Sequence, residues 1–138
     1  MAKTFDKHSI SAELSRKMIE AAIAKAEELK IAVVVAVIDE AGHLKGFCRM
    51  DNAALISVEV AQGKAYTSLF GLPSHELFNV LKGNPGIVAA LPNMGRILPV
   101  GGGLPVRVDG AMVGAIGVSG GSVEQDIACA QAGVDLAK

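Results

Sequence analysis

Apolar residues in the first part of the chain recur at helical spacing and then form a continuous run. After a polar arm over residues 1–10, a stripe of apolar side chains predicts a helix that Ser9 or Ser11 caps and that ends near Lys30. This stripe consists of Leu14, Met18, Ala22, Ala26 and Leu29. The β-branched run Ile31–Asp39 then predicts a strand buried on both faces, and Leu44–Met50 predicts its partner in a hairpin.

The middle of the chain predicts two helices followed by a loop. The longer helix covers Ala53–Phe70, with Asp51 or Asn52 as its cap, and the shorter one begins at Ser74. In the next segment, Gly83–Gly95, the apolar residues follow neither helical nor strand spacing, and the segment contains two prolines and three glycines. Loops of this length inside a compact domain are often functional or mobile.

The last part of the chain predicts strands joined by tight turns and a closing helix. Asp109-Gly110 separates two apolar runs and favours a type I′ hairpin, because both turn residues tolerate positive φ. Ser122 and Gln125 form a capping-box pattern where the helix begins. The strands expected here are Ile97–Val100, Leu104–Val108 and Ala111–Val118. The order α-β-β-α-α-β-β-β-α predicts one α+β domain over residues 1–138, with helices packed on a five-stranded, largely antiparallel sheet.

The composition of the chain predicts what kind of partner the protein has and in which compartment it is found. Hydrophobic residues make up 51% of the chain, so we expect part of the apolar surface to be buried between subunits of a homo-oligomer. A net charge of −1, with only four Phe and one Tyr, argues against a nucleic-acid partner. The apolar run Ile31–Ile38 is too short to cross a membrane. The polar N-terminus and the isolated Cys48 and Cys129 favour the cytoplasm.

The three histidines show none of the spacings typical of a metal site, so we expect no metal centre. His8 lies in the polar arm, where it is either an exposed tail residue or a ligand for haem iron or a metal. His43 fits a polar turn, and His75 fits the start of a short helix.

Two sets of charged residues are candidates for chemistry. Arg49 and Asp51 flank a strand-to-helix corner, where they either pair structurally or bind a carboxylate. Lys64 lies in an apolar helix, and a buried lysine needs an acid partner, for which Asp39, Asp51 and Asp126 are candidates. The pair is either structural or catalytic, in which case Lys64 and Asp126 handle protons or the lysine forms a Schiff base.

Two glycine clusters either turn the backbone sharply or bring it close to a ligand. One consists of Gly101, Gly102 and Gly103, and the other of Ser119, Gly120 and Gly121. The second cluster precedes a helix, whose N–H groups could hold an anion or a carboxylate. We expect any ligand pocket to lie near Arg49, Lys64 and these clusters.

Five segments of the chain resemble a known family. They are V-I-D-E-A-G-H-L, R-M-D-N-A, G-K-A-Y-T, G-G-G-L-P-V and V-G-A-I-G-V-S-G-G-S-V-E-Q-D. In this order they are similar to the GlcG/HbpS-like family, also called the haem-degrading domain family, which is related to the C-terminal domain of PduO-type corrinoid adenosyltransferases. The resemblance implies a five-stranded antiparallel sheet, homo-oligomers such as hexamers or octamers, and haem as the cofactor of some members.

The resemblance also implies a set of site residues. Thr67 is the candidate for a hydroxyl ligand to haem iron. The positions that match the family are Asp39, Arg49, Asp51, Lys64, Thr67 and Asp126, together with Gly101–Gly103 and Ser119–Gly121.

Three hypotheses of function follow. The first is a small-ligand-binding oligomer that holds haem or a related tetrapyrrole. The second is a cytoplasmic enzyme of a catabolic pathway, in which Arg49 binds a small carboxylate or carbonyl compound while Lys64 and Asp126 handle protons. The third is a non-catalytic accessory protein of such a pathway. Whether the protein is an enzyme is open at this point.

Overall fold

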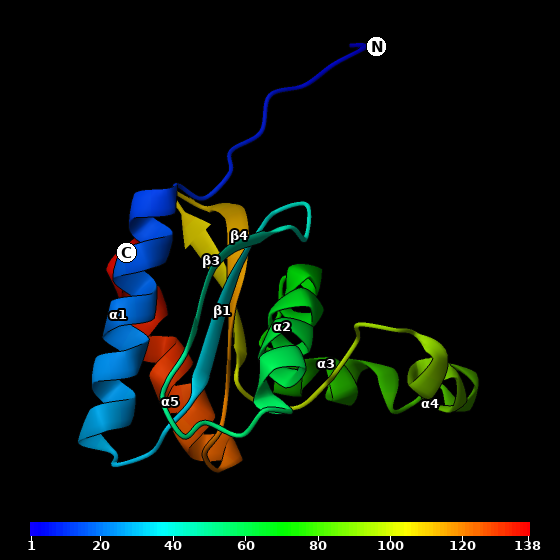
Figure 1. Cartoon of the computed structure of the whole chain (residues 1–138). Helices are drawn as coiled ribbons and strands as arrows, with labels where there is room; N and C mark the ends of the chain where they lie inside the picture. Colours follow the sequence, from blue (N-terminus) through cyan, green and yellow to red (C-terminus); the bar gives the residue numbers. More distant parts are fainter.

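The computed structural model describes residues 1–138 and places a four-stranded antiparallel sheet between helices on both of its faces (Figure 1). The strands, in the spatial order β2-β1-β4-β3, are β1 (Val34–Asp39), β2 (Leu44–Arg49), β3 (Gly103–Val108) and β4 (Ala111–Ser119). One face is covered by α1 (Ala12–Glu28) and α5 (Val123–Val134), and the other by α2 (Ser57–Thr67). The expected α+β class is therefore confirmed.

The side chains of β1 divide the core into two layers, because successive residues of a strand point to opposite faces. Val35 and Val37 belong to the larger apolar cluster under α1 and α5. Val34 and Ala36 pack under α2 instead. Helix α2 packs very close to the sheet, because a Cβ at Gly117 of β4 would collide with the backbone of α2. Burial on both faces explains why β1 is apolar from Val34 to Ile38.

The structure confirms three local patterns that the sequence predicts. Asp109 and Gly110 have φ of 50° and 82°, as a type I′ turn requires. At α5 the capping box is complete, because Ser122 accepts from the Gln125 N–H at 3.2 Å and its own N–H donates to the Gln125 side chain at 2.9 Å. Ser11 caps α1.

The predicted strand Ile97–Val100 is absent, so the five-stranded sheet is wrong. This segment crosses α2 instead of joining the sheet, and its Leu98 N–H donates to Thr67 Oγ1 at 2.6 Å. Pro99 has no N–H and cannot complete a ladder, which leaves the contact with α2 as the better way to bury the segment.

The helices of the middle segment also differ from the prediction. Helix α2 begins at Ser57 and not at Ala53, and no side chain caps it, because the chain turns at Asn52 with φ of 68°. Helix α3 covers Ser74–Leu81. The predicted loop contains α4 (Pro85–Ala90), which Asn84 caps. Short 3-10 turns follow three of the helices, over Ser68–Phe70, Leu91–Asn93 and Asp135–Ala137.

The N-terminal arm, residues 1–10, leaves the body of the protein beside the start of α1 (Figure 1). It is exposed up to Ser9, but Ile10 is 2% exposed and its N–H donates to the Val113 carbonyl at 3.0 Å. None of the helices is long and apolar enough to span a membrane.

Candidate functional site

Lys64 and Asp126 form an ion pair in the interior. Lys64 Nζ lies 2.9 Å from Asp126 Oδ2 and also donates to the Val118 carbonyl at 3.0 Å. Asp126 Oδ1 accepts from the Gly121 N–H at 2.8 Å, and the two charged side chains are 3% and 4% exposed. The pair therefore joins α2, on one face of the sheet, to α5 on the other. A catalytic role for it stays a prediction.

The first glycine cluster packs around this ion pair. A Cβ at Gly102 would lie 2.9 Å from Lys64 Nζ, and one at Gly103 would collide with the Lys64 carbonyl. The Gly103 N–H donates to Ser74 Oγ at 2.9 Å. None of the surface hollows is lined by Gly101, Gly102, Gly103 or Lys64. Their ligand-binding role stays a prediction, and it requires an opening that this chain lacks.

The second cluster, at the end of β4, likewise has partners within the chain. Ser119 Oγ bonds to a serine of α2 at 3.2 Å, and Gly120 packs against the backbone that precedes β1. The N–H of Gly121 donates to Asp126, and the following N–H donates to Gln125. The N–H groups that we expected to hold an anion are thus occupied by side chains of α5.

The remaining charged candidates lie apart from the ion pair. Arg49 and Ser119 flank the same residue of β1, so two strand spacings, about 10 Å, separate them. Arg49 and Asp51 are both exposed and form no ion pair. Asp39, at the opposite end of β1, shapes the turn that follows by accepting from two N–H groups, one of them that of His43, at 2.9 Å each. The structure does not gather the predicted residues into one pocket.

Thr67 connects α2 to the segment that crosses it. Its side chain is fully buried, and its hydroxyl donates to the Gly63 carbonyl at 2.7 Å while accepting from the Leu98 N–H at 2.6 Å. The hydroxyl is therefore already used as donor and as acceptor. Its role as an iron ligand stays a prediction, and it would require Leu98 to move away.

A hollow of about 460 Å³ lies where the N-terminal arm meets the β3–β4 hairpin. Its apolar walls come from the arm, from α1 and from the hairpin, and His8 lines it beside them. The lining residues are His8, Ser9, Ile10, Ser11, Leu14, Val108, Asp109, Ala111 and Val113. This volume is in the range of small-molecule and cofactor sites. None of the matched family positions lines this hollow.

His8 is held between two anchors, so it is not part of a loose tail. On one side Lys7 Nζ lies 2.8 Å from Glu40 Oε2, and on the other Ile10 is buried. Hydrogen bonds from Lys7 and then from Ser9 hold the pKa of the Glu40 carboxyl below its ordinary value. The one sequence signal for this site was an apolar residue, Ile10, at the end of a polar arm.

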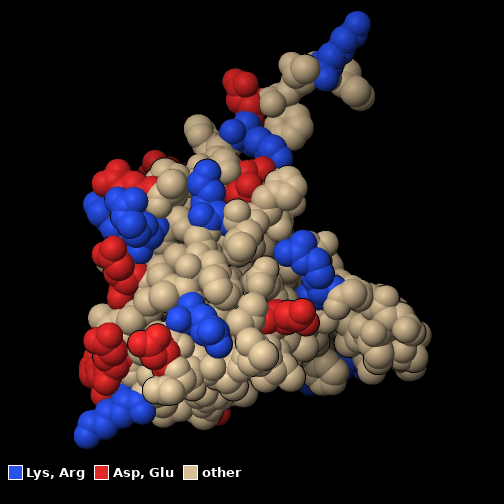
Figure 2. Space-filling view, viewed as in Figure 1, with Lys and Arg blue, Asp and Glu red and all other residues tan.

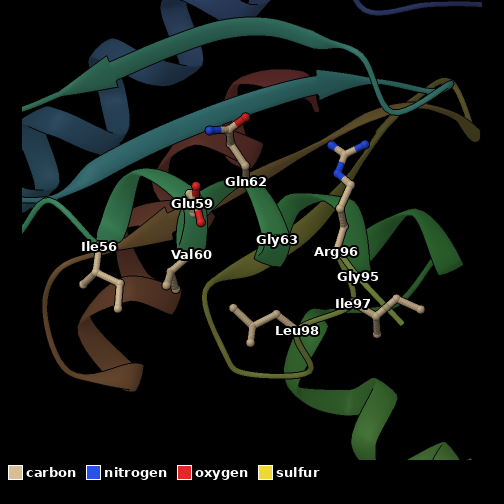
Figure 3. Close-up of a pocket in the computed structure, with 9 residues that line it drawn as sticks. All are labelled: Ile56, Glu59, Val60, Gln62, Gly63, Gly95, Arg96, Ile97 and Leu98. Atoms are coloured by element: carbon tan, nitrogen blue, oxygen red, sulfur yellow. The ribbon is translucent and has the colours of Figure 1, made fainter. Parts of the chain in front are cut away.

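A second hollow, of about 490 Å³, lies between α2 and the segment that crosses it (Figure 3). In Figure 3, the polar ends of Gln62 and Arg96 extend to one side and the apolar side chains lie on the other. The Arg96 guanidinium stacks 4.2 Å from the centre of the Tyr66 ring and donates to the Gly42 carbonyl at 3.2 Å.

A model of the family described as "Haem degrading protein HbpS-like" matches residues 10–135 of the chain. This protein belongs to the HbpS-like family. A relative of this chain, an uncharacterized 15.0 kDa protein from the dhaT-dhaS intergenic region of Citrobacter freundii, is 37% identical over 92% of this chain and 91% of its own length. The recognition of the family from sequence is thus confirmed.

Two further relatives connect the HbpS-like fold to named proteins. The corrinoid adenosyltransferase PduO of Citrobacter freundii is 33% identical over 91% of this chain, but the match spans only 38% of that longer protein. A crystal structure of a PduOC:haem complex is 33% identical, with a TM-score of 0.85 and coverage of 93% of this chain and 94% of its own. A member of this fold with about a third of its residues identical therefore occurs with haem.

Proposed function

We propose that this protein binds haem in the hollow beside the N-terminal arm, where His8 would hold the iron. The observation that carries the proposal is an imidazole at the edge of an apolar hollow, in a chain that belongs to a haem-degrading family. Neither of the other two histidines lines a hollow.

The residues present fit the chemistry of the group. Haem presents a large apolar ring and an iron that commonly takes a histidine nitrogen from the protein, with the surrounding pocket setting its reactivity. Leu14, Val108 and Val113 supply apolar walls that would exclude water from the ring. Lys7 and Ile10, as anchors on both sides of His8, would hold the imidazole at the hollow.

The competing ligand within the chain is Thr67. Its hydroxyl would have to leave two hydrogen bonds and a fully buried position to reach an iron. Removing two hydrogen bonds from a buried hydroxyl costs on the order of 1–3 kcal/mol, whereas His8 is exposed and has no such bonds to break. This difference favours His8.

A haem titration of the full chain, followed by its Soret absorbance, tests the proposal. The matched control is His43→Ala, because His43 is 81% exposed in the β1–β2 turn, outside the hollow. We expect saturable binding by the parent and by His43→Ala, and a loss of affinity of roughly tenfold or more for His8→Ala. Equal titrations for the two alanine variants would reject His8 as the ligand, and binding that never saturates would reject the site.

We also propose that the protein assembles into a homo-oligomer, of six or eight subunits as the family resemblance implies. Exposed apolar side chains support this, since Leu55, Ile56 and Phe70 are 75%, 74% and 62% exposed in a single chain. Light scattering on the purified protein tests it, and a monomer at all concentrations would contradict it.

A further inference from the structure

The segment from Phe78 to Met94, here called the α3–α4 projection, extends away from the sheet (Figure 1). Helix α4 has six residues and buries none of them, and α3 buries only Ser74 and Leu77. A helix this short is not stable in water without packing against other groups. The projection therefore lacks, within its own chain, the contacts that would stabilise it.

The projection is largely apolar, and Lys82 is its only charged residue. Phe78, Val80 and Met94 are 43%, 65% and 36% exposed, and no charged residue occurs from Gly83 to Gly95. Figure 2 shows the end of the projection, on the right, as a surface without Lys, Arg, Asp or Glu. Such a surface fits an apolar partner and does not fit a nucleic acid or a strongly charged protein.

The hollow between α2 and the crossing segment lies at the base of the projection, and one of its walls is apolar like the projection. Its apolar residues are Ile56, Val60, Ile97 and Leu98, and Leu55 beside it is 75% exposed. A projection with exposed apolar side chains and a hollow with an apolar wall on one surface are the two halves of a contact that two copies can make reciprocally.

The charges around the hollow point to the same partner. Glu59 and Arg96 line it, both are exposed, and neither forms an ion pair. Arg96 stacks on Tyr66 and donates to the Gly42 carbonyl, but neither it nor Glu59 has a partner of opposite charge. An acid and a base on one patch therefore complement a second copy of the same patch.

We infer that the α3–α4 projection of one copy packs in the α2 hollow of a second copy, and that the second copy's projection packs in the first. Two-fold symmetry then brings Glu59 of each copy to Arg96 of the other. The second copy completes the hollow, which a single chain leaves open. This inference rests on the proposed assembly and names its interface; it is independent of haem.

The first test places a charge on the projection and measures mass by light scattering. Val80→Glu and Val88→Glu should lower the mass of the oligomer, while the control Leu44→Glu, at a 52% exposed apolar residue of β2, should not. Circular dichroism checks that each variant is folded. If the parent is an oligomer and both projection variants, folded, keep its mass, another surface forms the assembly and the inference is wrong. If the parent itself is a monomer, the proposed assembly fails as well.

The second test uses charge reversal and mixing. Glu59→Arg alone and Arg96→Glu alone each place like charges at both reciprocal contacts, so each variant should dissociate. Mixing the two variants gives pairs in which both contacts join opposite charges, and the parent mass should return. A mixture that stays dissociated would overturn the inference, because the rescue requires the two residues to meet between copies.

Discussion

Replacing Asp126 with alanine should unfold the protein more readily than almost any other single change, because it leaves a buried lysine without its counter-ion. Lys64 is 3% exposed, and its ammonium has only the Val118 carbonyl besides the carboxylate. Removing one partner of a buried pair costs about 3–5 kcal/mol, out of a total stability of about 5–15 kcal/mol. With a urea m value of about 2 kcal/mol/M, the unfolding midpoint should fall by about 2 M.

The assay is urea unfolding followed by circular dichroism, with all variants at one protein concentration because assembly contributes to stability. The exposed pair Glu13–Lys17, at 3.2 Å, supplies the control: Glu13→Ala should cost no more than about 0.5 kcal/mol. The double variant Lys64→Met/Asp126→Leu should recover most of the loss, since neither buried charge remains. A cost for Asp126→Ala as small as that of Glu13→Ala would refute the reasoning.

Three further outcomes follow from the packing and from the pKa shifts. Gly117→Ala should destabilise by about 1–3 kcal/mol in urea unfolding, because its Cβ meets the α2 backbone, whereas Gly83→Ala meets nothing and should be neutral. Burial raises the pKa of the Cys129 thiol to about 11, so iodoacetamide at pH 8 should label the half-exposed Cys48 and spare Cys129 in the folded protein. Folding lowers the pKa of Glu40 from 4.5, so its contact with the N-terminal arm stabilises the folded protein at neutral pH. This stabilisation is lost as the pH falls below 4.5, and protease cleavage of the arm should then increase.

Local patterns predicted the parts of the fold that local interactions determine. Asp109-Gly110 and the Ser122–Gln125 box specify a turn and a cap with atoms only a few residues apart, and both formed as expected. The segment at Pro99 was predicted as a strand and became a connection across α2. Its conformation depends on Thr67, which lies far away in the sequence.

The site was harder to predict because one residue pattern serves two purposes. A glycine such as Gly103 allows close approach by a ligand or by a helix, and here α2 fills the space. A lysine in an apolar helix required an acid, yet only the fold could select Asp126 among three candidates. The sequence left His8 as either an exposed tail residue or an iron ligand, because its anchors, Lys7–Glu40 and Ile10, depend on contacts between distant parts of the chain.

The most direct measurement of the central claim is rescue of His8→Gly by free imidazole in the presence of haem. If His8 ligates the iron, the glycine variant should lose the Soret spectrum of the parent complex and regain it when imidazole is added. His43→Gly should match the parent throughout. A His8→Gly spectrum identical to that of the parent before any imidazole is added would contradict the account.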